Sequence, residues 1–363
     1  MRAEAIEAMT PYLDAMYANP SGSHRFAREA RKALDEARDL VAATLGCKPG
    51  EVVFTSGGTE GDNHAILGAV RRLGGVAVCP AAEHHAVLHC VEHVHGVVVR
   101  VNSVGTVDLD DLQRVLEEAT EEQPITVVSV MAVNNEVGSI TPMRDVARIV
   151  RKYAPNAILH TDAVQAACWL DLRTIWPHVD ALTLSAHKFG GPKGVGVMVL
   201  KTGKHLEPLI LGGGQEREIR SGTLNTPSIV AFATAVKDSY DAARVSGLRD
   251  SFIAGVKRLI PDAYINGEKS ARLPGIVNVT FPGTQSDTLL LLLDSAHVSA
   301  STGSACSAGV HEASHVLLAM GHSEETAQSS LRFSFGATST QGDVDFVLSV
   351  LPDVISRGRA AHT

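Results

Sequence analysis

The sequence predicts an α/β protein with a large domain built on a mostly parallel sheet and a smaller α+β domain. The chain has 363 residues, which is more than one domain usually holds, so about two domains are expected. From residue 51 to about residue 200, short apolar segments alternate with helical ones, which is typical of βαβ units. We expect an N-terminal segment, 1–18, that packs with the small domain, a large domain, 19–245, and a small domain, 246–363.

The elements can be followed in order along the chain. Apolar residues at spacings of three and four predict helices over 3–18 and 24–45. Strands are predicted next in EVVFT, GVAVC, GVVVRV, ITVVSVM, AILHT, DALTLSA and GVGVMVL, with helices over 109–119 and 143–153 between them. Pro227 lies near the start of a helix-rich stretch that links the two domains. The strand-like segments GIVNVTF and SSLRFSFG and a final helix from about residue 341 belong to the small domain.

Composition and charge exclude several classes of protein. The formal net charge is −8 and no run of Lys and Arg offers a footprint for a nucleic-acid backbone, so no direct nucleic-acid ligand is expected. No apolar run approaches the roughly 20 residues that a membrane helix needs, and MRAEAIEAM lacks the pattern of a signal peptide. We therefore expect a cytoplasmic protein with no membrane partner. Five cysteines without a CxxC pair predict neither a disulfide framework nor a metal site.

The stretch FTSGGTEGDNHAIL, 54–67, places glycines and a hydroxyl between a strand and a helix. Glycines that expose backbone N–H groups at a helix N-terminus, with a hydroxyl beside them, suit a phosphate. The glycine spacing matches neither the dinucleotide fingerprint nor the Walker pattern. A tight turn with an N-cap is the alternative that this motif leaves open.

Two further segments, LHTDAVQ and SAHKFGGPKG, each follow an apolar strand. Asp162 closes the first strand and is suited either to capping a helix or to holding a proton on a heterocyclic nitrogen, as pyridoxal phosphate requires. Lys188 is either a solvated side chain or an amine that meets a carbonyl cofactor at the mouth of a pocket. Ser185 and His187 flank this lysine and are suited to binding a phosphate. Together these groups favour pyridoxal phosphate over the alternatives.

AEHHAVL, 82–88, offers His84 and His85 at the start of a predicted helix. Adjacent positions on a helix point in different directions and no third ligand is spaced to help, so a metal site is not favoured. If these residues have a function, a neutral imidazole could stack over a planar ring and transfer protons. The alternative is that both histidines are surface residues without a role.

SASTGSACSAGV, 299–310, sets one cysteine among small residues and glycines. A dozen residues at about 3.3 Å each could carry the thiol of Cys306 across a wide cleft. A thiol needs a nearby base or cation to become the reactive thiolate, and an incidental cysteine in a flexible loop is the alternative. Arg332, in SSLRFSFG, is a candidate planar fork for a substrate carboxylate.

Taken together, these segments closely resemble the cysteine desulfurases of the NifS/IscS group, in the class V aminotransferase family of fold type I pyridoxal phosphate enzymes. The match covers nearly the whole chain through the ordered motifs FTSGGTE, EHHAV, NNEVG, HTDAVQ, SAHKFGGPKGVG, GGGQEREIRSGT, STGSACSAG and SSLRFSFG. The resemblance implies the fold type I transferase architecture and a pyridoxal 5'-phosphate cofactor in a Schiff base with Lys188. It implies His84 stacked on the ring, Asp162 at the pyridine nitrogen, Gln165 near the phenolic oxygen, and Gly58, Thr59, Ser185 and His187 at the phosphate.

The resemblance also implies an activity and partners. Lys188 would remove the α-proton of L-cysteine and the Cys306 thiolate would attack its sulfur, leaving L-alanine and a Cys306 persulfide. Asn135 and Arg332 would hold the substrate carboxylate. Thr223 would reach the phosphate of the neighbouring subunit, which makes a homodimer the active unit. A long, mobile cysteine loop in the small domain implies transfer to an acceptor protein: an iron–sulfur scaffold, a tRNA thiolation carrier or the DNA phosphorothioation machinery.

Alternatives within and outside this family stay open. Selenocysteine cleavage could use the same pocket, whereas transamination needs no thiol; a noncatalytic binding partner would keep the fold and cofactor without turnover. Family members usually begin with a segment like YLDxAATTP, whereas this chain starts at MRAEAIEAM. That segment normally lines the substrate pocket, so we expect cofactor binding to survive and substrate turnover to be the property at risk.

Overall fold

The computed structural model of the chain describes residues 1–303 and 313–362. It consists of two compact units. The larger unit comprises Met1–Val99, Leu109–Ala132 and Pro142–Ser239, and the smaller one comprises Arg100–Asp108, Val133–Thr141 and Tyr240–Thr363.

These units differ from the predicted domains in where the smaller one begins and in what it includes. It starts at Tyr240 instead of residue 246, and it takes in two excursions from the first half of the chain. Each excursion is closed by an antiparallel bridge, Val101 to Val107 and Val133 to Ile140. The second excursion is also bridged to the rest of the unit through Ser139 and Arg272. Such backbone pairing between remote segments leaves no hydrophobic pattern in the sequence.

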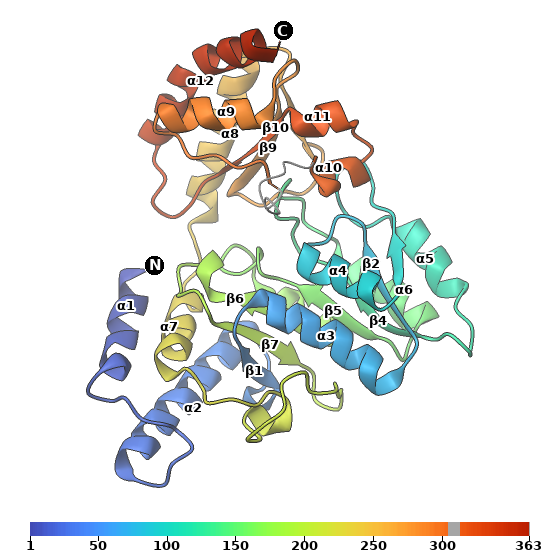
Figure 1. Ribbon diagram of the computed structural model, residues 1–363, viewed down its shortest axis with the longest axis vertical. Helices are drawn as coiled ribbons and strands as arrows, with labels where there is room; N and C mark the ends of the chain where they lie inside the picture. The colour runs from blue at the N-terminus through green and yellow to red at the C-terminus, as the bar shows by residue number, and fades with distance from the viewer. Residues whose placement is uncertain (304–312, 363) are drawn as a thin grey trace. The chain divides into compact units, whose positions relative to one another are not determined.

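The larger unit is built on a sheet with the strand order β1-β7-β6-β5-β4-β2-β3 (Figure 1). The pairs β2–β3, β2–β4, β4–β5 and β5–β6 are parallel, whereas β7 runs antiparallel to its neighbours β1 and β6. The prediction of a mostly parallel sheet is thus confirmed. The strands are β1 Val52–Thr55, β2 Val76–Pro80, β3 Val97–Val99, β4 Ile125–Ser129, β5 Ile158–Asp162, β6 Ala181–Ser185 and β7 Gly196–Leu200.

Helices cover this sheet and account for its buried strands. Every residue of β4, β5, β6 and β7 is buried, as expected of strands packed on both faces. Helix α3 crosses one face and contacts β4 to β7 (Figure 1). The α-helices of the unit are α1 Ala3–Met9, α2 Arg25–Leu45, α3 Gly58–Leu73, α4 His85–His93, α5 Leu109–Glu117, α6 Met143–Tyr153 and α7 Thr226–Val236. Its 3-10 turns are η1 Thr10–Leu13, η2 Pro49–Glu51, η3 Leu172–Thr174, η4 Trp176–His178, η5 Ala186–Lys188 and η6 Glu216–Glu218.

The N-terminal helix corrects one prediction. Helix α1 belongs to the larger unit and packs against α7, so residues 1–18 do not join the small domain as expected. Arg2 fixes the start of this helix, because its backbone N–H donates to the carbonyl of Gly190 at 2.8 Å and its Nη2 donates to the carbonyl of Asp238 at 2.9 Å. The helix is also shorter than the predicted 3–18. Pro11 has no N–H to continue the α-helical ladder, and the chain passes into η1.

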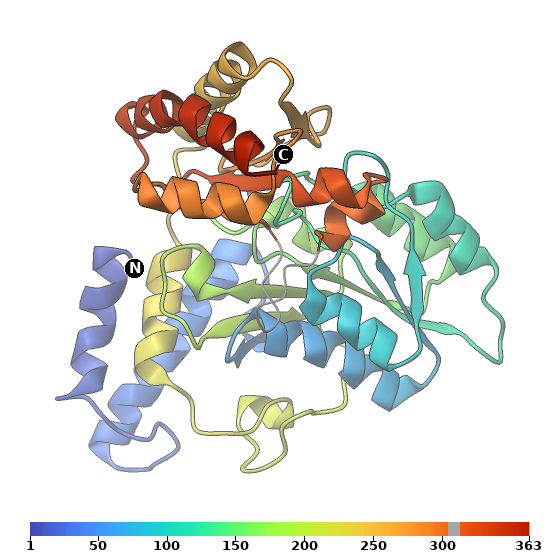
Figure 2. The same cartoon turned by 45° about the horizontal axis from the view of Figure 1, so that its top comes forward.

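The smaller unit is an α+β structure with an antiparallel sheet in the order β10-β9-β8. Its C-terminal helices are drawn in orange and red in Figure 2. Helices α8 and α9 pack against α12, and α8 also contacts β9. Phe252, Val279 and Leu351 are among the buried residues of this core. The elements are β8 Tyr264–Asn266, β9 Ile276–Thr280, β10 Ser330–Ser334, α8 Ala242–Leu259, α9 Ser286–Ser295, α10 His315–Ala319, α11 Glu324–Gln328 and α12 Gln341–His362.

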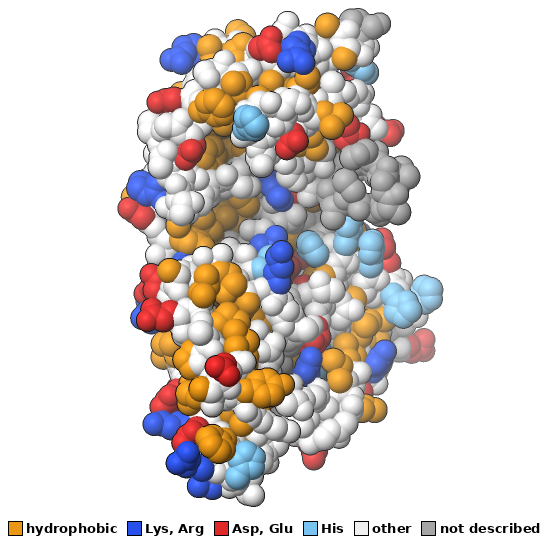
Figure 3. All heavy atoms as spheres, turned by 60° about the vertical axis from the view of Figure 1, so that its left-hand side comes forward, with side chains coloured by type: hydrophobic (Ala, Val, Ile, Leu, Met, Phe, Trp, Pro, Cys, Tyr) orange, Lys and Arg blue, Asp and Glu red, His pale blue; other side chains and the backbone are white. Residues whose placement is uncertain are grey.

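Two properties of the surface and helices bear on possible partners. Within the described part of the chain, no helix has the length and apolar character required to cross a membrane. On the face drawn in Figure 3, acidic and basic side chains are interspersed.

Candidate functional site

The predicted cofactor residues of the larger unit gather at one edge of its sheet. β1, β5 and β6 point in the same direction, because β7 is antiparallel to both β1 and β6 while β5 is parallel to β6. Asp162 and Ser185 are the last residues of β5 and β6, and Gly58 follows β1 by a short turn. The carboxyl edge of a parallel sheet is the usual place for a ligand.

The turn between β1 and α3 has the properties of an anion cradle. Helix α3 begins at Gly58 and no side chain caps its first turn, which leaves backbone N–H groups available to a ligand. A Cβ on Gly58 would lie 3.0 Å from Val164 Cγ2 and 3.6 Å from Ser185 Cβ, so the backbone approaches the ends of the neighbouring strands closely. A Cβ on Gly196 would lie 2.7 Å from the backbone of Gly57. Glycine at these positions lets the turn pack closely on the strand ends, and the uncapped N–H groups of α3 suit a phosphate.

Ser185, at the end of β6, lies beside this turn and contacts His187. Ser185 Oγ lies 2.9 Å from His187 Nδ1, so the hydroxyl and the ring form a hydrogen-bonded pair. Partial burial lowers the pKa of His187, and the positive charges of Lys188 and Lys193 lower it further. His187 is thus neutral at physiological pH and acts as a hydrogen-bonding group.

Asp162 has the environment that a protonated ring nitrogen requires. Its carboxyl group is buried and its Oδ1 accepts the backbone N–H of Val164 at 2.8 Å. Burial raises the pKa of Asp162 to about 6, while that hydrogen bond and the charge of Lys188 act in the opposite direction. The group is mostly ionised at neutral pH and lies in surroundings that favour pairing with a cation.

The turn that carries Lys188 is packed against buried residues on its C-terminal side. Lys188 is the last residue of η5, and the next residue, Phe189, is fully buried with its ring edge-on to Phe232, 5.1 Å between centroids. Gly190 then takes a positive φ of 88° and a Cβ there would meet Arg2. The lysine itself is exposed, so its amine can reach a ligand while its backbone is fixed.

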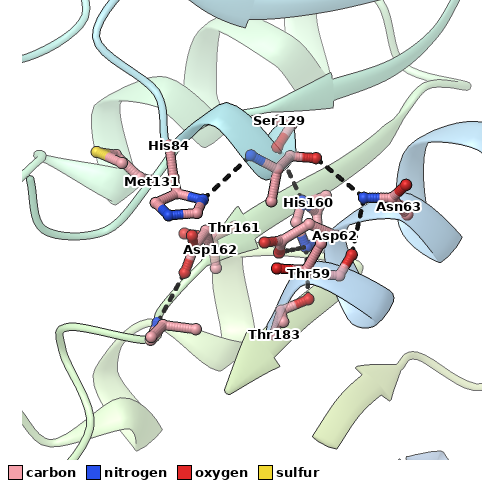
Figure 4. Close-up of polar contacts among 12 residues, drawn as sticks. Thr59, Asp62, Asn63, His84, Ser129, Met131, His160, Thr161, Asp162 and Thr183 are labelled. Atoms are coloured by element: carbon pink, nitrogen blue, oxygen red, sulfur yellow. Dashed lines mark hydrogen bonds and ion pairs between the residues drawn. The ribbon is translucent and has the colours of Figure 1, made fainter. Parts of the chain in front are cut away.

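His84 is the N-cap residue of α4, and its Nδ1 accepts the backbone N–H of Ala86 at 3.1 Å (Figure 4). The ring is exposed and lines a cavity of about 610 Å³ together with Thr59 and His85. The rings of His85 and His89, one turn apart on α4, are stacked with their centroids 4.6 Å apart. No group of three or more histidine, cysteine or acidic side chains in residues 1–303 and 313–362 is arranged to hold a metal ion.

Two other predicted cofactor residues, Gln165 and Thr223, form no hydrogen bond or ion pair with the residues above in the described part of the chain. Gln165 is half-buried in the turns after β5, and Thr223 is exposed. Thr223 follows a segment that is anchored by two ion pairs.

Glu216 forms a buried ion pair with Arg38, and Arg220 pairs with Glu60 in the first turn of α3 at 2.8 Å. Glu216, Arg217 and Glu218 in this segment all have positive φ angles, of 47°, 58° and 66°.

A buried polar network below this edge was not predicted from the sequence. His160 on β5 is fully buried, with its Nδ1 2.8 Å from Ser129 Oγ and its Nε2 2.9 Å from Thr183 Oγ1 (Figure 4). Asp62 on α3 lies beside it, with Oδ1 3.6 Å from the same Nε2. His160 stands two residues before Asp162 on one strand, so both side chains share a face; this spacing is a sequence signal for the position of His160, though not for its contact with Asp62.

Arg332 and Asn135, the predicted carboxylate ligands, meet in the smaller unit. Arg332 Nη1 donates to the backbone carbonyl of Asn135 at 2.9 Å. Arg332 Nε and Asn135 Oδ1 are buried and have no hydrogen-bond partner in the described part of the chain. Burial lowers the pKa of Arg332, and the charge of Glu136 raises it. A buried, unpaired donor atom on this half-buried cation fits an anionic ligand such as a carboxylate.

Cys306 lies outside the described residues, but the chain on either side of its segment is placed in the smaller unit. Ser301 is paired with Arg332 through both of their backbone amides. Ser314 caps α10 and donates from Oγ to Glu136 Oε2 at 2.5 Å. A Cβ on Gly303 would lie 2.6 Å from the same oxygen. Glu136 therefore contacts the chain both before and after residues 304–312.

Comparison with known proteins shows the family of this chain and agrees with its fold. The family model for the class-V aminotransferases matches residues 1–347, and the chain belongs to that family. It is 39% identical over 372 residues to the cysteine desulfurase IscS of Dictyoglomus turgidum, covering 99% of this chain and 93% of that protein. Among solved structures, a NifS-like protein superposes with a TM-score of 0.89 at 33% identity over 98% of this chain and 96% of its own.

A second solved structure, described as SspA in complex with cysteine, has a TM-score of 0.79 and 32% identity over 94% of this chain and 97% of its own. The predicted family resemblance and the predicted α/β fold of a type I pyridoxal phosphate enzyme are confirmed by these matches.

Proposed function

We propose that the chain is a pyridoxal phosphate-dependent cysteine desulfurase, which removes sulfur from L-cysteine and yields L-alanine and a persulfide on Cys306. The single observation that carries the proposal is the convergence of the Gly58 turn, Asp162 and Lys188 on one sheet edge, in a chain of the class-V aminotransferase family. These groups come from three separate strands, and each suits a different part of the cofactor.

Pyridoxal phosphate, when bound, would withdraw electrons from the α-carbon of the amino acid. The residues of the chain would do the remaining work. N–H groups at Gly58 and Thr59, with Ser185 and His187, would bind the phosphate. Asp162 Oδ2 would hold a proton at the ring nitrogen.

His84 would stack on the ring and Gln165 would bind its phenolic oxygen. The Nζ of Lys188 would hold the cofactor at its aldehyde group and would move the α-proton of the substrate.

Three further residues would hold and cleave the substrate. Arg332 and Asn135 would bind the carboxylate of L-cysteine, which supplies the partner that the buried Nε of Arg332 lacks among the described residues. The Cys306 thiolate would form a bond to the substrate sulfur as the carbon–sulfur bond breaks, and a proton would complete L-alanine. This exchange converts cysteine and a thiol into alanine and a persulfide, so no external oxidant or reductant is needed.

The other cysteines support Cys306 as the nucleophile. Burial raises the pKa of Cys47 to about 12 and those of Cys90 and Cys168 to about 11, and it raises that of Cys79 as well. These four side chains are thiols at neutral pH, and a thiol is a poor nucleophile.

A homodimer and a protein acceptor for the sulfur belong to the same proposal. Thr223 is exposed and follows a segment anchored by Glu216 and Arg220, which would suit it to reaching the phosphate of a neighbouring subunit. The relatives named IscS support iron–sulfur cluster assembly as the destination of the sulfur. Free cysteines without a CxxC pair support action in the reducing cytoplasm.

The first test replaces Lys188. We expect Lys188→Ala to abolish the visible absorbance of the lysine-bound cofactor and the release of alanine, because the proposal assigns both the covalent link to the cofactor and the proton transfer to its Nζ. Absorbance spectra of purified protein measure this, and Lys193→Ala, on an exposed residue of the same loop, is the matched control. An unchanged spectrum in Lys188→Ala would overturn the assignment.

The second test replaces Cys306. Cys306→Ser should keep the cofactor absorbance and lose persulfide formation, since the hydroxyl cannot take up sulfur. Alkylation followed by mass spectrometry of the protein after addition of L-cysteine measures the persulfide, with Cys47→Ser as the control that keeps it. A persulfide still formed by Cys306→Ser would assign the nucleophile to another residue.

A further inference from the structure

Three carboxyl groups lie in the interior of the larger unit close to the proposed ring site. Asp62 comes from α3, Glu83 from the turn before α4 and Asp162 from the end of β5, and their exposed fractions are 1%, 0% and 7%. Burial raises the pKa of all three, and the charge of Asp162 adds to the increase for Asp62 and Glu83. Three negative charges at this depth would repel one another strongly, so the negative charge must be confined to fewer groups.

His160 does not neutralise them. Burial lowers its pKa to about 3, so the ring is neutral and carries one N–H. Ser129 meets Nδ1 and Thr183 meets Nε2, and Thr183 is also hydrogen-bonded to Asp62 (Figure 4). Ser129, His160, Thr183 and Asp62 thus form one continuous chain of hydrogen bonds.

This chain has two consistent arrangements of its protons, because a hydroxyl has one proton to donate and the neutral ring has one N–H. In the first, Asp62 is a protonated acid that donates to Thr183, Thr183 donates to Nε2, and His160 donates from Nδ1 to Ser129. In the second, every bond is reversed and Asp62 is a carboxylate. The charge of Asp62 and the tautomer of His160 are therefore linked.

The contacts of Asp62 favour the first arrangement. Its Oδ1 is buried without a hydrogen-bond partner in the described residues. A carboxylate oxygen in that position would be a bare negative charge, whereas the carbonyl oxygen of a neutral acid costs much less to bury. The titratable groups that face Asp62 are Asp162, Glu83, His160 and the Cys90 thiol, and none of these four is a cation.

We infer that Asp62 is held as the neutral acid and, through Thr183, fixes His160 in its Nδ1–H tautomer, so that Asp62 places no second negative charge near Asp162. Asp62 is in this sense a positioning residue for Asp162. Its importance for cofactor binding rests on the proposed function, but the protonation state of Asp62 and the tautomer of His160 do not.

The protonation state is tested by infrared spectroscopy of the full chain. Asp62→Asn should remove one carbonyl stretching band of a protonated carboxyl group, and in the wild type this band should persist from about pH 6 to about pH 8, where an ordinary aspartate is fully ionised. Asp39→Asn, at an exposed position, is the control that removes no such band. No band lost in Asp62→Asn, or a band that disappears across this pH range, would overturn the inference.

The link to His160 is tested by the nitrogen-15 spectrum of its ring, assigned by its absence in His160→Gln. The wild type should show the Nδ1–H tautomer. Asp62→Asn should keep it, because the amide also donates to Thr183, whereas Asp62→Ala should lose it. An Nε2–H tautomer in the wild type, or one unaffected in Asp62→Ala, contradicts the arrangement.

The effect on Asp162 is tested by the pH dependence of pyridoxal phosphate binding. The dissociation constants of Asp62→Asn should stay within about twofold of the wild type at each pH, while those of Asp62→Ala should rise about tenfold or more, which is the order expected for one lost buried hydrogen bond. A binding profile of Asp62→Asn displaced to lower pH would mean that Asp62 is charged in the wild type. A wild-type chain that binds no cofactor would refute the proposed function, and the two spectroscopic tests would still decide the state of Asp62.

Discussion

Arg332 shows at the scale of a single residue how burial prepares a group for its ligand. Its guanidinium is held from one side by the carbonyl of Asn135, and its Nε faces no acceptor in the described residues. A buried cation with an unused donor is costly until an anion pairs with it. The cost is removed when a carboxylate binds, so the same feature that destabilises the free protein favours the complex.

We expect Arg332→Lys to raise the KM for L-cysteine about tenfold or more. A lysine keeps the positive charge but cannot donate from two positions of a planar fork, and one charge-assisted hydrogen bond is worth roughly 1.5–3 kcal/mol. Steady-state alanine release measures the effect. Arg357→Lys, on the exposed face of α12, should leave KM within about twofold. An unchanged KM in Arg332→Lys would remove Arg332 from the carboxylate site.

Helix α8 shows at the scale of an element that two glycines in one helix can have opposite roles. A Cβ added to Gly255 would lie 2.3 Å from Leu348 of α12, so this glycine permits the close packing of the two helices. A Cβ added to Gly247 would meet nothing within 4 Å. Gly247 therefore has only the usual disadvantage of glycine in a helix, its greater backbone freedom in the unfolded chain.

We expect Gly255→Ala to lower the free energy of unfolding by about 1–3 kcal/mol, as overpacking usually does. In contrast, Gly247→Ala should raise it by up to about 1 kcal/mol. Urea unfolding followed by circular dichroism measures both variants side by side. If the two substitutions changed stability in the same direction, the packing of α8 against α12 would have to differ from the one described.

At the scale of the whole molecule, the sequence is informative wherever function depends on a residue next to a strand end. Asp162 and Lys188 could be assigned to one edge because each follows an apolar strand in a βαβ series. Asp62 and His160 could not be paired in this way. Their contact depends on how α3 crosses β5, which is a long-range packing arrangement that no local pattern encodes. The segment Arg100–Asp108 could not be assigned from the sequence either, because it packs with a unit formed mostly by the last third of the chain.

The stability of the whole fold should depend on pH through His160. Its folded pKa of about 3 lies below the roughly 6.5 of an unfolded histidine, so the unfolded state binds a proton that the folded state does not. The contribution of neutral His160 to the free energy of unfolding is fully present above about pH 6.5 and is lost as the pH falls toward about 3. Between about pH 7 and about pH 5, the free energy of unfolding should fall by about 2 kcal/mol from this residue alone.

Urea titrations at the two pH values, on the wild type and His160→Gln, measure this contribution. The variant should be less stable at neutral pH, but its decrease on acidification should be smaller by about that amount. An equal decrease in both proteins would mean that His160 is not buried in its neutral form.

The segment Glu216–Glu218 limits which sequences can replace it. Three successive residues with side chains occupy the left-handed region that glycine prefers, and the buried pair of Glu216 with Arg38 holds them there. Valine, isoleucine or threonine at position 217 would crowd the backbone in that conformation, whereas glycine or asparagine would fit it. Homologous chains that keep this turn are therefore free to vary at Arg217 only toward residues that accept its backbone geometry, however exposed the position is.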